Sequence, residues 1–513
     1  MVWTLLLIFL IAGTVSSWSV IVAALNCKWS NKFYPDTQAH HTHSGKALRI
    51  GGIGIIIGFI LTFGLLFLIN YIYGIFDIND LQKKNLIAVI VGAVACFTLG
   101  FIDDIRPIDA KFKFFIQIFI AIFAYQSGLS IDRVVVPFLE WELDFNNYGM
   151  FLTIIWFVSI INLINLIDGL DGLAGGIGLM LMILLAVLSA EKVVDISTFI
   201  SIGMAGAILG FLIHNFPPAK VYMGDSGAYA IGFIIAALAL MNLQKGAVIA
   251  ALLGPMMAMA LPIIDVLFAL IRRALQGLPL FRPDKDHIHH KLMKSGLSRK
   301  KTVLVLYAIS MVAFVGGILA FSNQGRFFPI FIGFASVIII FSIRIYGNPS
   351  IHIRELFADS FNSRYETQNA IRLSKWFVSE IDRIRRGEDL FKDYKILLRK
   401  LGFEKVTIII DGVERTYKYS EKDSEEIFEE DELFIKSIMK INSNEDNEKI
   451  IFWGRREFFP NRRFSLNTDI AFEAWVSATK RWKVLNEEDF NFGSIAKKQD
   501  NLKIENARDL YLS

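Results

Sequence analysis

Carboxylate and amide side chains recur at short intervals near the ends of apolar segments in this 513-residue chain. In segment 162–172, Asn162, Asn165, Asp168 and Asp171 recur at every third residue. This spacing places their side chains near one another on one face of a helix. Their oxygens are the ligands that hard cations such as Mg²⁺ prefer. The segment therefore predicts a cation or polar-substrate site at a helix end.

Two further acidic segments offer related chemistry. Asp103 and Asp104 are adjacent, and neighbouring carboxylates ionise together only when a cation lies beside them. This pair indicates a metal site or a general base, or it is only a solvated helix cap. In segment 217–227, Asp225, which lies between Gly224 and Gly227, is explained either as the N-cap of a helix or as a metal ligand. The residues alone leave these alternatives open.

Two basic segments could bind phosphate. Segment 282–291 contains His287, His289 and His290 among Lys and Arg residues, without the Cys or Glu of a zinc pattern. Histidine donors and cations would neutralise a diphosphate and serve as acid or base near neutral pH, although a solvated basic loop is the alternative. Lys46 and Arg49 belong to the second basic segment, 40–52, for which anchoring by basic residues beside a membrane helix is sufficient explanation.

The elements that must position these residues are membrane helices. The chain is 54% hydrophobic and 20% charged. Residues 1–345 contain 42 charged residues, about 12%, and residues 346–513 contain 60, about 36%. This contrast predicts a transmembrane domain, 1–345, and a soluble domain, 346–513. The small net charge of +4 gives no indication of a nucleic-acid partner, and two cysteines provide no disulfide framework.

The expected fold is an all-α polytopic membrane protein of about eleven transmembrane helices with a C-terminal soluble α/β or α+β domain. The apolar runs lie at about 2–25, 50–74, 85–102, 112–129, 149–166, 175–190, 198–215, 226–243, 246–271, 302–321 and 327–345. Most basic residues of the first domain fall in alternate loops, which the positive-inside rule assigns to the cytoplasm. The N-terminus is then outside, and the soluble domain is cytoplasmic. That soluble domain contains no catalytic motif.

Taken together, the motifs resemble those of the polyprenyl-phosphate N-acetylhexosamine-1-phosphate transferases. The resemblance covers about residues 1–320 and rests on four motifs in order: Asp103-Asp104, segment 162–172, Met223-Gly224-Asp225-Ser226-Gly227 and His287-Ile288-His289-His290. The His-Ile-His-His form and the eleven spans are similar to the branch that transfers N-acetylglucosamine-1-phosphate from UDP-N-acetylglucosamine. The phospho-N-acetylmuramoyl-pentapeptide transferase of peptidoglycan synthesis, which usually has three consecutive histidines, is the alternative.

The resemblance implies a reaction at the bacterial inner membrane. Undecaprenyl phosphate attacks the β-phosphorus of a UDP-sugar and releases UMP, with Mg²⁺, or alternatively Mn²⁺, on the diphosphate. Asp225 would be the principal metal ligand, accompanied by Asp104, and Asp103 would lie near the lipid phosphate as a proposed base. A base is not required chemically, because a phosphate monoester with a second pKa near 6 is already mostly ionised at pH 7.

The resemblance also assigns substrate-binding residues. The nucleotide pocket would be lined by Asn162, Asn165, Asp168 and Asp171, with Tyr222 stacking on uracil. The phosphates would be held by Lys111, His287, His289 and His290. The family commonly has an Arg-Lys pair and a Pro where this chain has His40-His41 and Leu48, so Lys46 and Arg49 are the residues of that loop that would replace them.

Other classes of protein explain fewer of these features. A phosphatidyltransferase that uses CDP-alcohols needs an Arg after the Asp-Gly motif, which is missing here. A proton-coupled transporter would place its ionisable residues at the membrane midplane rather than at one face. A non-enzymatic membrane sensor would explain the soluble domain but not the four polar motifs. The sequence leaves open the sugar, the formation of a homodimer, and the ligand or protein partner of residues 346–513.

Overall fold

The computed structural model describes the chain in several stretches. They are residues 2–26, 48–76, 78–136, 141–145, 148–190, 194–243, 263, 267, 273, 292–293, 296–321, 353–384, 387–410, 413–419, 434–440, 449–455 and 463–479. The chain folds into two compact units. The first contains the described helices from Val2 to Phe321, and the second contains the helices and strands from Ile353 onward.

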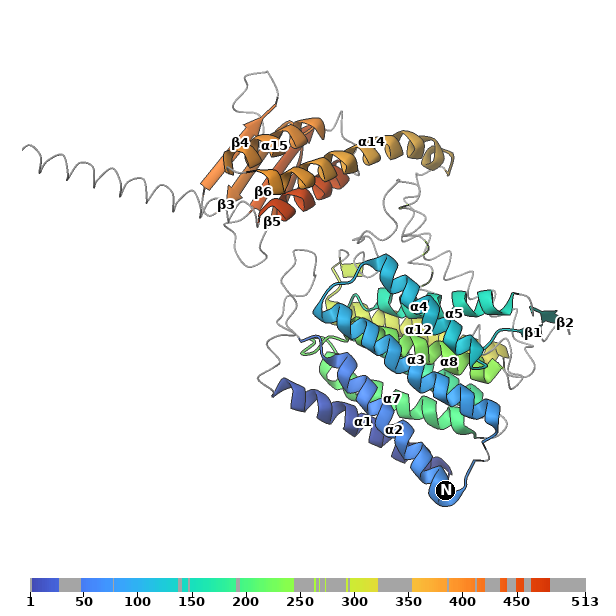
Figure 1. Cartoon of the computed structure of the whole chain (residues 1–513). Coiled ribbons are helices and arrows are strands. Elements are labelled where there is room, and N and C mark those ends of the chain that lie inside the picture. Colours follow the sequence, from blue (N-terminus) through green and yellow to red (C-terminus); the bar gives the residue numbers. More distant parts are fainter. Residues whose placement is uncertain are drawn as a thin grey trace, which may run out of the picture. The chain divides into compact units, whose positions relative to one another are not determined.

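The first unit is a bundle of long apolar helices (Figure 1). They are α1 (Val2–Leu25), α2 (Gly51–Tyr73), α3 (Asp80–Ile105), α4 (Ala110–Gln126), α5 (Gly149–Ile167), α6 (Leu173–Ala190), α7 (Ile196–Asn215), α8 (Gly224–Leu243) and α12 (Arg299–Phe321). Seven of these described helices, all except α4 and α12, are long and apolar enough to cross a bilayer. The prediction of a multi-pass helical membrane protein is therefore confirmed.

The predicted number of spans is matched in part. Nine of the eleven apolar runs coincide with the helices above, although α4 has only 17 residues. The remaining runs, 246–271 and 327–345, lie outside the described residues apart from 263 and 267. The count of eleven spans and the sidedness of the loops stay predictions.

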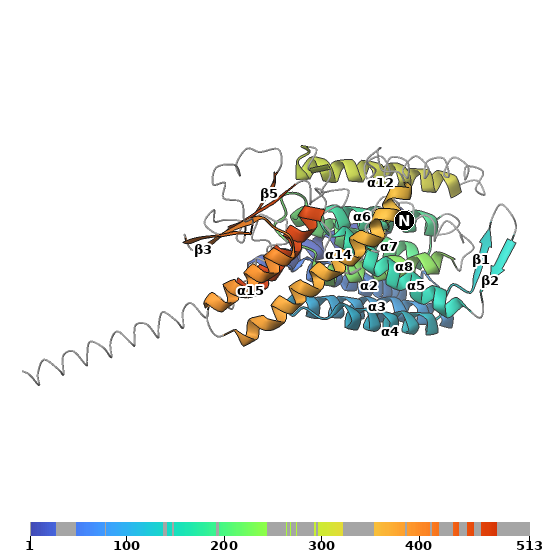
Figure 2. The same ribbon diagram turned by 90° about the horizontal axis from the view of Figure 1, so that it is seen from above.

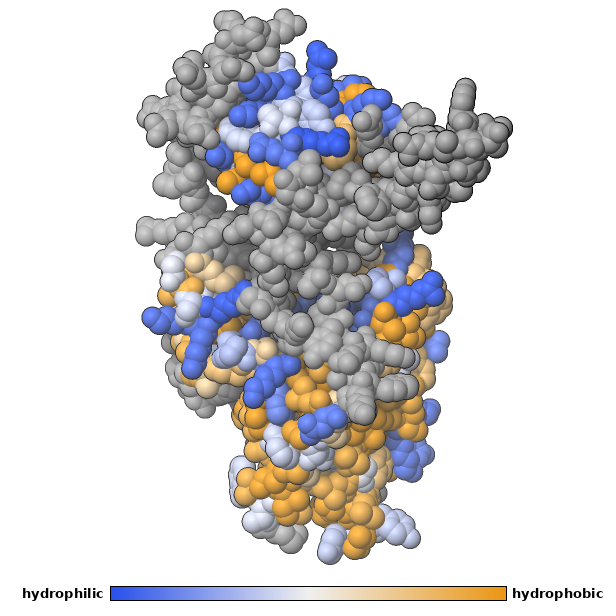
Figure 3. Space-filling model, turned by 90° about the vertical axis from the view of Figure 1, so that its left-hand side faces the viewer, coloured by the Kyte–Doolittle hydropathy of each residue, from blue (hydrophilic) through white to orange (hydrophobic). Residues whose placement is uncertain are grey.

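Helix α8 lies at the centre of the first unit, in contact with α2, α3, α5, α6 and α7 (Figure 2). Its residues from Ala228 to Leu240 are almost all buried. Helices α1 and α7 approach closely because Gly13 and Gly206 have no side chains. A Cβ at either position would meet the backbone of the other helix. Small residues of this kind are common at helix interfaces in membranes. Much of the face of this unit seen in Figure 3 is hydrophobic, and its exposed apolar side chains include Leu68 and Phe119, which are 55% and 69% exposed. This surface suits contact with lipid.

A short hairpin between α4 and α5 was not predicted from the sequence. Strands β1 (Arg133–Val136) and β2 (Trp141–Asp144) pair antiparallel. Four residues are too few for a clear alternation of apolar and polar side chains. The hairpin follows the end of α4 and precedes the start of α5, whereas the polar motifs lie where α4 begins and α5 ends.

The second unit is a small antiparallel sheet with helices. Its helical elements are α14 (Ile353–Glu380), η3 (Ile381–Arg383), α15 (Gly387–Lys400) and residues 463–479. Its strands are β3 (Lys405–Ile410), β4 (Val413–Lys418), β5 (Phe434–Lys440) and β6 (Lys449–Arg455), in the order β4-β3-β6-β5. Alternate residues such as Val406 and Phe452 are buried in one core with Tyr394 and Trp475 from the helices.

Candidate active site

The polar motifs meet at one end of the helical bundle, where α3 and α5 end and α4 and α8 begin. The chain before α2 joins this end through a short parallel pairing of Leu48 with Val221. Tyr222 donates its backbone N–H to the carbonyl of Leu48 at 2.8 Å, and Gly51 donates to the carbonyl of Tyr222 at 2.9 Å. The half-buried Arg49 is thereby held beside the loop that precedes α8.

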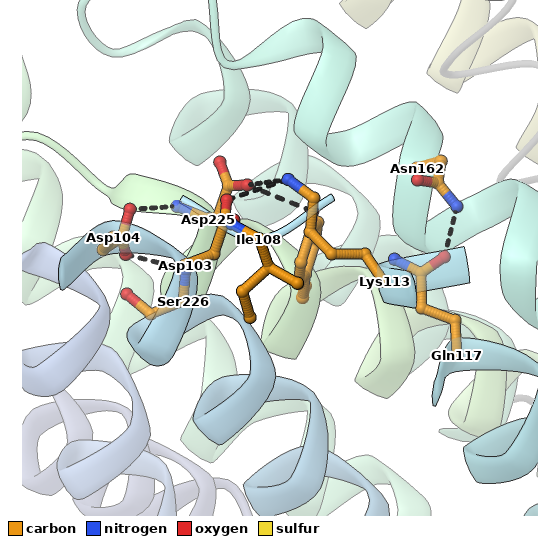
Figure 4. Close-up of polar contacts among 9 residues, drawn as sticks. Asp103, Asp104, Ile108, Lys113, Gln117, Asn162, Asp225 and Ser226 are labelled. Atoms are coloured by element: carbon orange, nitrogen blue, oxygen red, sulfur yellow. Dashed lines mark hydrogen bonds and ion pairs between the residues drawn. The ribbon is translucent and has the colours of Figure 1, made fainter. Parts of the chain in front are cut away.

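Asp104 caps α8 from another helix. Its Oδ1 and Oδ2 accept the backbone N–H groups of Asp225 and Ser226, each at 3.0 Å (Figure 4). Two glycines permit this approach. Gly224 has a positive φ of 73°, and a Cβ there would meet the Asp104 carboxylate, while a Cβ on Gly100 would meet the backbone of Asp225. The cap of α8 is therefore Asp104, and the side chain of Asp225 is left for other contacts.

Lys113 lies between two carboxylates. Its Nζ is 2.8 Å from Oδ2 of Asp103 and 3.5 Å from Oδ2 of Asp225 (Figure 4). Asp103 also accepts the backbone N–H of Ile108 at 2.7 Å, and Asp225 accepts the hydroxyl of Tyr229 at 3.1 Å. The three charged side chains are only 12–27% exposed. One cation therefore stabilises two carboxylates. Because all three groups are partly buried, their attraction is stronger than that of an ion pair on the surface.

The Asp-Gly loop between α5 and α6 is fastened to the loop before α8. Asp171 accepts the backbone N–H of Ala219 at 3.2 Å. The buried amide of Asn215 accepts the N–H of Gly172 and donates to the carbonyl of Val221, each at 2.8 Å. This fastening holds both loops at the same end of the bundle.

The pKa values of side chains in these two loops depend on burial and on the neighbouring carboxylates. Burial, followed by the charges of Asp225 and Asp104, holds the pKa of Asp168 well above its usual range, although Arg49 acts in the opposite direction. Burial, aided by the charge of Asp171, raises the pKa of Tyr222 to about 12. The carboxylates of Asp104, Asp171 and Asp225 thus repel that of Asp168, and a bound cation would relieve this repulsion.

Two asparagines of α5 extend the polar cluster into the bundle. The Nδ2 of Asn162 donates to Oε1 of Gln117 at 2.6 Å and to the carbonyl of Val158 at 2.7 Å. The backbone carbonyl of Asn165 accepts the N–H of Asp168 at 3.1 Å, and its side chain hydrogen-bonds to Tyr229. The predicted helical face of segment 162–172 therefore forms as far as the end of α5, and Asp171 lies in the loop beyond it.

The structure brings most of the described candidate residues together. Those at this end of the bundle are Arg49, Asp103, Asp104, Asn162, Asn165, Asp168, Asp171, Tyr222 and Asp225. Lys111 is exposed on α4, two residues from Lys113 and hence on the opposite side of that helix. The other four candidates, Lys46, His287, His289 and His290, lie outside the described residues.

The reasoning from sequence gave no role to Lys113, Gln117 or Asn215. A signal existed for two of them, because Lys113 and Gln117 are polar residues four positions apart in a largely apolar helix and so share one face. For Asn215 no such signal exists, since its partners at Gly172 and Val221 are backbone groups brought near by the fold.

The carboxylates suit a magnesium ion that also binds substrate. Among the described residues, no group of three or more His, Cys, Asp or Glu side chains is close enough together to hold a metal ion alone. Mg²⁺, however, is commonly held by one or two carboxylates together with waters and substrate phosphates. Asp103 and Asp225 are near enough for a contact between their carboxyl groups, whereas both oxygens of Asp104 already accept backbone N–H groups.

Comparison with known proteins gives a consistent family. The family model described as glycosyl transferase family 4 matches residues 86–242, from α3 to α8. The probable undecaprenyl-phosphate N-acetylglucosaminyl 1-phosphate transferase of Bacillus subtilis is 34% identical over 272 residues, which are 53% of this chain and 72% of the relative. The decaprenyl-phosphate N-acetylglucosaminephosphotransferase of Mycobacterium tuberculosis is 32% identical over 304 residues, which cover 55% of this chain and 74% of the relative. The undecaprenyl-phosphate alpha-N-acetylglucosaminyl 1-phosphate transferase of Escherichia coli is 28% identical over 290 residues, which cover 55% of this chain and 75% of the relative.

Proposed function

Because the chain belongs to the polyprenyl-phosphate N-acetylhexosamine-1-phosphate transferases, a family of membrane phosphotransferases, we propose that it transfers N-acetylglucosamine-1-phosphate from UDP-N-acetylglucosamine to undecaprenyl phosphate. UMP is the second product, and the lipid-linked sugar starts synthesis of a cell-envelope polysaccharide. The names of the three relatives, each specifying N-acetylglucosamine, support this sugar. Transfer of phospho-N-acetylmuramoyl-pentapeptide is the alternative.

The observation that carries the proposal is the cluster of Asp103, Lys113 and Asp225, bordered by Asp104 and Asp168, at one end of a membrane bundle. Phosphoryl transfer depends on positioning the reactants and on stabilising spread negative charge, rather than on covalent chemistry by the protein. A site at the end of membrane helices also suits one lipid substrate and one water-soluble substrate.

In the proposed reaction, an oxygen of the lipid phosphate forms a bond to the β-phosphorus of the UDP-sugar. The bond from that phosphorus to the bridging oxygen breaks, and its electron pair leaves with UMP. Mg²⁺ held by Asp225 and a neighbouring carboxylate, Asp103 or Asp104, would neutralise the diphosphate. Lys113 offsets the repulsion between the carboxylates and offers its ammonium group to phosphate oxygens. Asp103 then acts through its charge, because the lipid phosphate is already ionised.

The nucleotide half of the substrate would bind beside the fastened loops. We assign Asn165, Asp168, Asp171 and Tyr222 to this proposed nucleotide pocket, and the charge of Arg49 acts on both Asp168 and Tyr222. Lys46 and the three histidines stay proposed phosphate ligands, whereas we propose Lys113 in place of Lys111, because Lys111 is exposed on the other side of α4. We place the site and the second unit on the cytoplasmic side of the bacterial inner membrane and the N-terminus outside, on the basis of the basic loops.

The experiment that tests this proposal is an assay of UMP release by the full chain purified in detergent. Undecaprenyl phosphate and Mg²⁺ or Mn²⁺ are supplied with UDP-N-acetylglucosamine, UDP-N-acetylgalactosamine or UDP-N-acetylmuramoyl-pentapeptide. We expect release that depends on the lipid and on the metal ion, with the first donor only, and loss of release in the Asp225→Asn variant. Release with the pentapeptide donor alone would establish the alternative, and no release from any donor by a folded enzyme would contradict both.

A further inference from the structure

A buried glutamine has an unused hydrogen-bond donor beside the carboxylate cluster. Gln117 is 1% exposed in α4. Its Oε1 accepts a hydrogen bond from Asn162 at 2.6 Å, whereas its Nε2 has no hydrogen-bond partner among the described residues. Buried polar groups are almost always paired, because an unpaired one loses its water without compensation. A donor of this kind at a binding site indicates a ligand that completes it.

The orientation of the Gln117 amide is fixed by its neighbour. Asn162 uses its Nδ2 for two acceptors, Oε1 of Gln117 and the carbonyl of Val158. An amide nitrogen carries two hydrogens, so both are engaged. If the Gln117 amide were turned over, its nitrogen would face the Asn162 nitrogen, and two donors would oppose each other. The Nε2 of Gln117 is therefore held pointing away from Asn162.

The free donor lies next to Lys113. Gln117 follows Lys113 by four residues, and residues at this spacing share a face of the helix. In Figure 4 the nitrogen of the Gln117 amide is on the side nearer Lys113. Lys113 in turn contacts Asp103 and Asp225. The amide and the ammonium group can thus reach the same anionic group.

The position of α4 indicates which substrate supplies that group. This helix packs mainly against α3 and α5 and lies at an outer edge of the first unit (Figure 2). Phe112, Phe115 and Phe119 along it are 58–69% exposed, so this edge faces lipid. Gln117 is on the opposite, buried face of α4, so an acceptor lipid that enters from the bilayer would pass this helix to reach it, whereas a nucleotide sugar comes from water.

We propose that Nε2 of Gln117 donates a hydrogen bond to a phosphate oxygen of the acceptor lipid, with Asn162 holding the amide in place. The inference rests on the proposed function and adds a named lipid-phosphate ligand to it. A neutral donor strengthens binding of the phosphate without adding a second cation that would compete with Lys113 for the carboxylates.

The first test measures lipid binding without turnover. The full chain in detergent is unfolded thermally with and without undecaprenyl phosphate, in the absence of any sugar donor. We expect the lipid to raise the melting temperature of the wild type and of Asn242→Leu, and to have little effect on Gln117→Leu. Asn242 is the matched control, because it is also an amide 1% exposed in the bundle but lies at the far end of α8. Equal stabilisation of all three proteins would overturn the inference.

The second test separates the two substrates kinetically. A hydrogen bond to a charged group is worth roughly 10-fold to 100-fold in binding. We expect Gln117→Leu and the equally sized Gln117→Glu to raise KM for the lipid by that factor, with KM for the UDP-sugar unchanged. A rise in KM for the UDP-sugar instead would assign the donor to the diphosphate and overturn the proposal. A wild type that binds lipid through Gln117 but releases no UMP would contradict the proposed function and leave this inference supported.

Discussion

The carboxylate of Asp104 accepts the backbone N–H of Asp225 at 3.0 Å, although the two residues are 121 positions apart. The same carboxylate accepts the N–H of Ser226. The end of α3 thereby fixes the first turn of α8, and the Asp225 side chain is directed toward Lys113 and Asp103. The two acidic motifs form one structural unit in which one residue positions the other.

Replacing Asp104 by Asn should therefore affect both stability and activity. An amide offers one acceptor where the carboxylate offers two, so one buried N–H of the first turn of α8 loses its partner, at a cost of about 1–3 kcal/mol. We expect a lower melting temperature and a large loss of UMP release. Asp225→Asn should lose activity with an unchanged melting temperature. Equal melting temperatures for the two variants would show that Asp104 does not fix α8.

A second prediction concerns the glycine in this contact. Gly224 combines a φ of 73° with a position where a Cβ would meet the Asp104 carboxylate. Gly224→Ala should therefore destabilise the protein by more than the ~1 kcal/mol expected from φ alone, and it should reduce activity by displacing Asp104. Gly74→Ala is the control, because Gly74 has a φ of 58° and nothing within 4 Å of its Cβ position. Similar melting temperatures in the two variants would contradict the steric argument.

The two lysines of α4 should behave differently. Lys113 contacts Asp103 and Asp225, whereas Lys111 is exposed on the other side of the helix. Lys113→Met leaves two neighbouring carboxylates without their cation and removes a phosphate-binding charge, so we expect a fall in kcat of about 100-fold or more. Lys111→Met should change kcat by less than about twofold, because its charge lies away from the cluster and in contact with solvent. A large fall in kcat for Lys111→Met with little change for Lys113→Met in the UMP assay would contradict this expectation and would support Lys111 as the phosphate ligand, as assigned from sequence.

This difference shows what the sequence could and could not predict. The membrane helices and the acidic motifs follow from composition and spacing, because each depends on residues close together in the chain. The choice of Lys113 over Lys111 depends on which face of α4 packs against α5, and that is decided by residues distant in sequence. The capping of α8 by Asp104 and the fastening by Asn215 involve backbone groups, which carry no signal in a list of side chains.

The last prediction concerns pH and Asp168. The pKa of this carboxyl is raised well above 3.8 in the folded protein, first by burial and then by the charges of Asp225 and Asp104. Between pH 3.8 and the raised value, the folded state holds a proton that the unfolded state has released. The stabilisation is thus fully present below pH 3.8 and is lost as the pH rises through the raised pKa. In EDTA, the melting temperature of the wild type should fall over this range more steeply than that of Asp168→Asn.

Magnesium should reduce this slope in the wild type, because a cation near Asp225 favours the ionised form of Asp168. Melting temperatures measured from about pH 4 upward, with EDTA or with Mg²⁺, supply the comparison. A wild type and an Asp168→Asn variant with parallel pH profiles in EDTA would show that Asp168 is ionised in the folded protein. A slope that responds to Mg²⁺ in the wild type and not in Asp168→Asn would link this carboxylate to the metal ion before any substrate is bound.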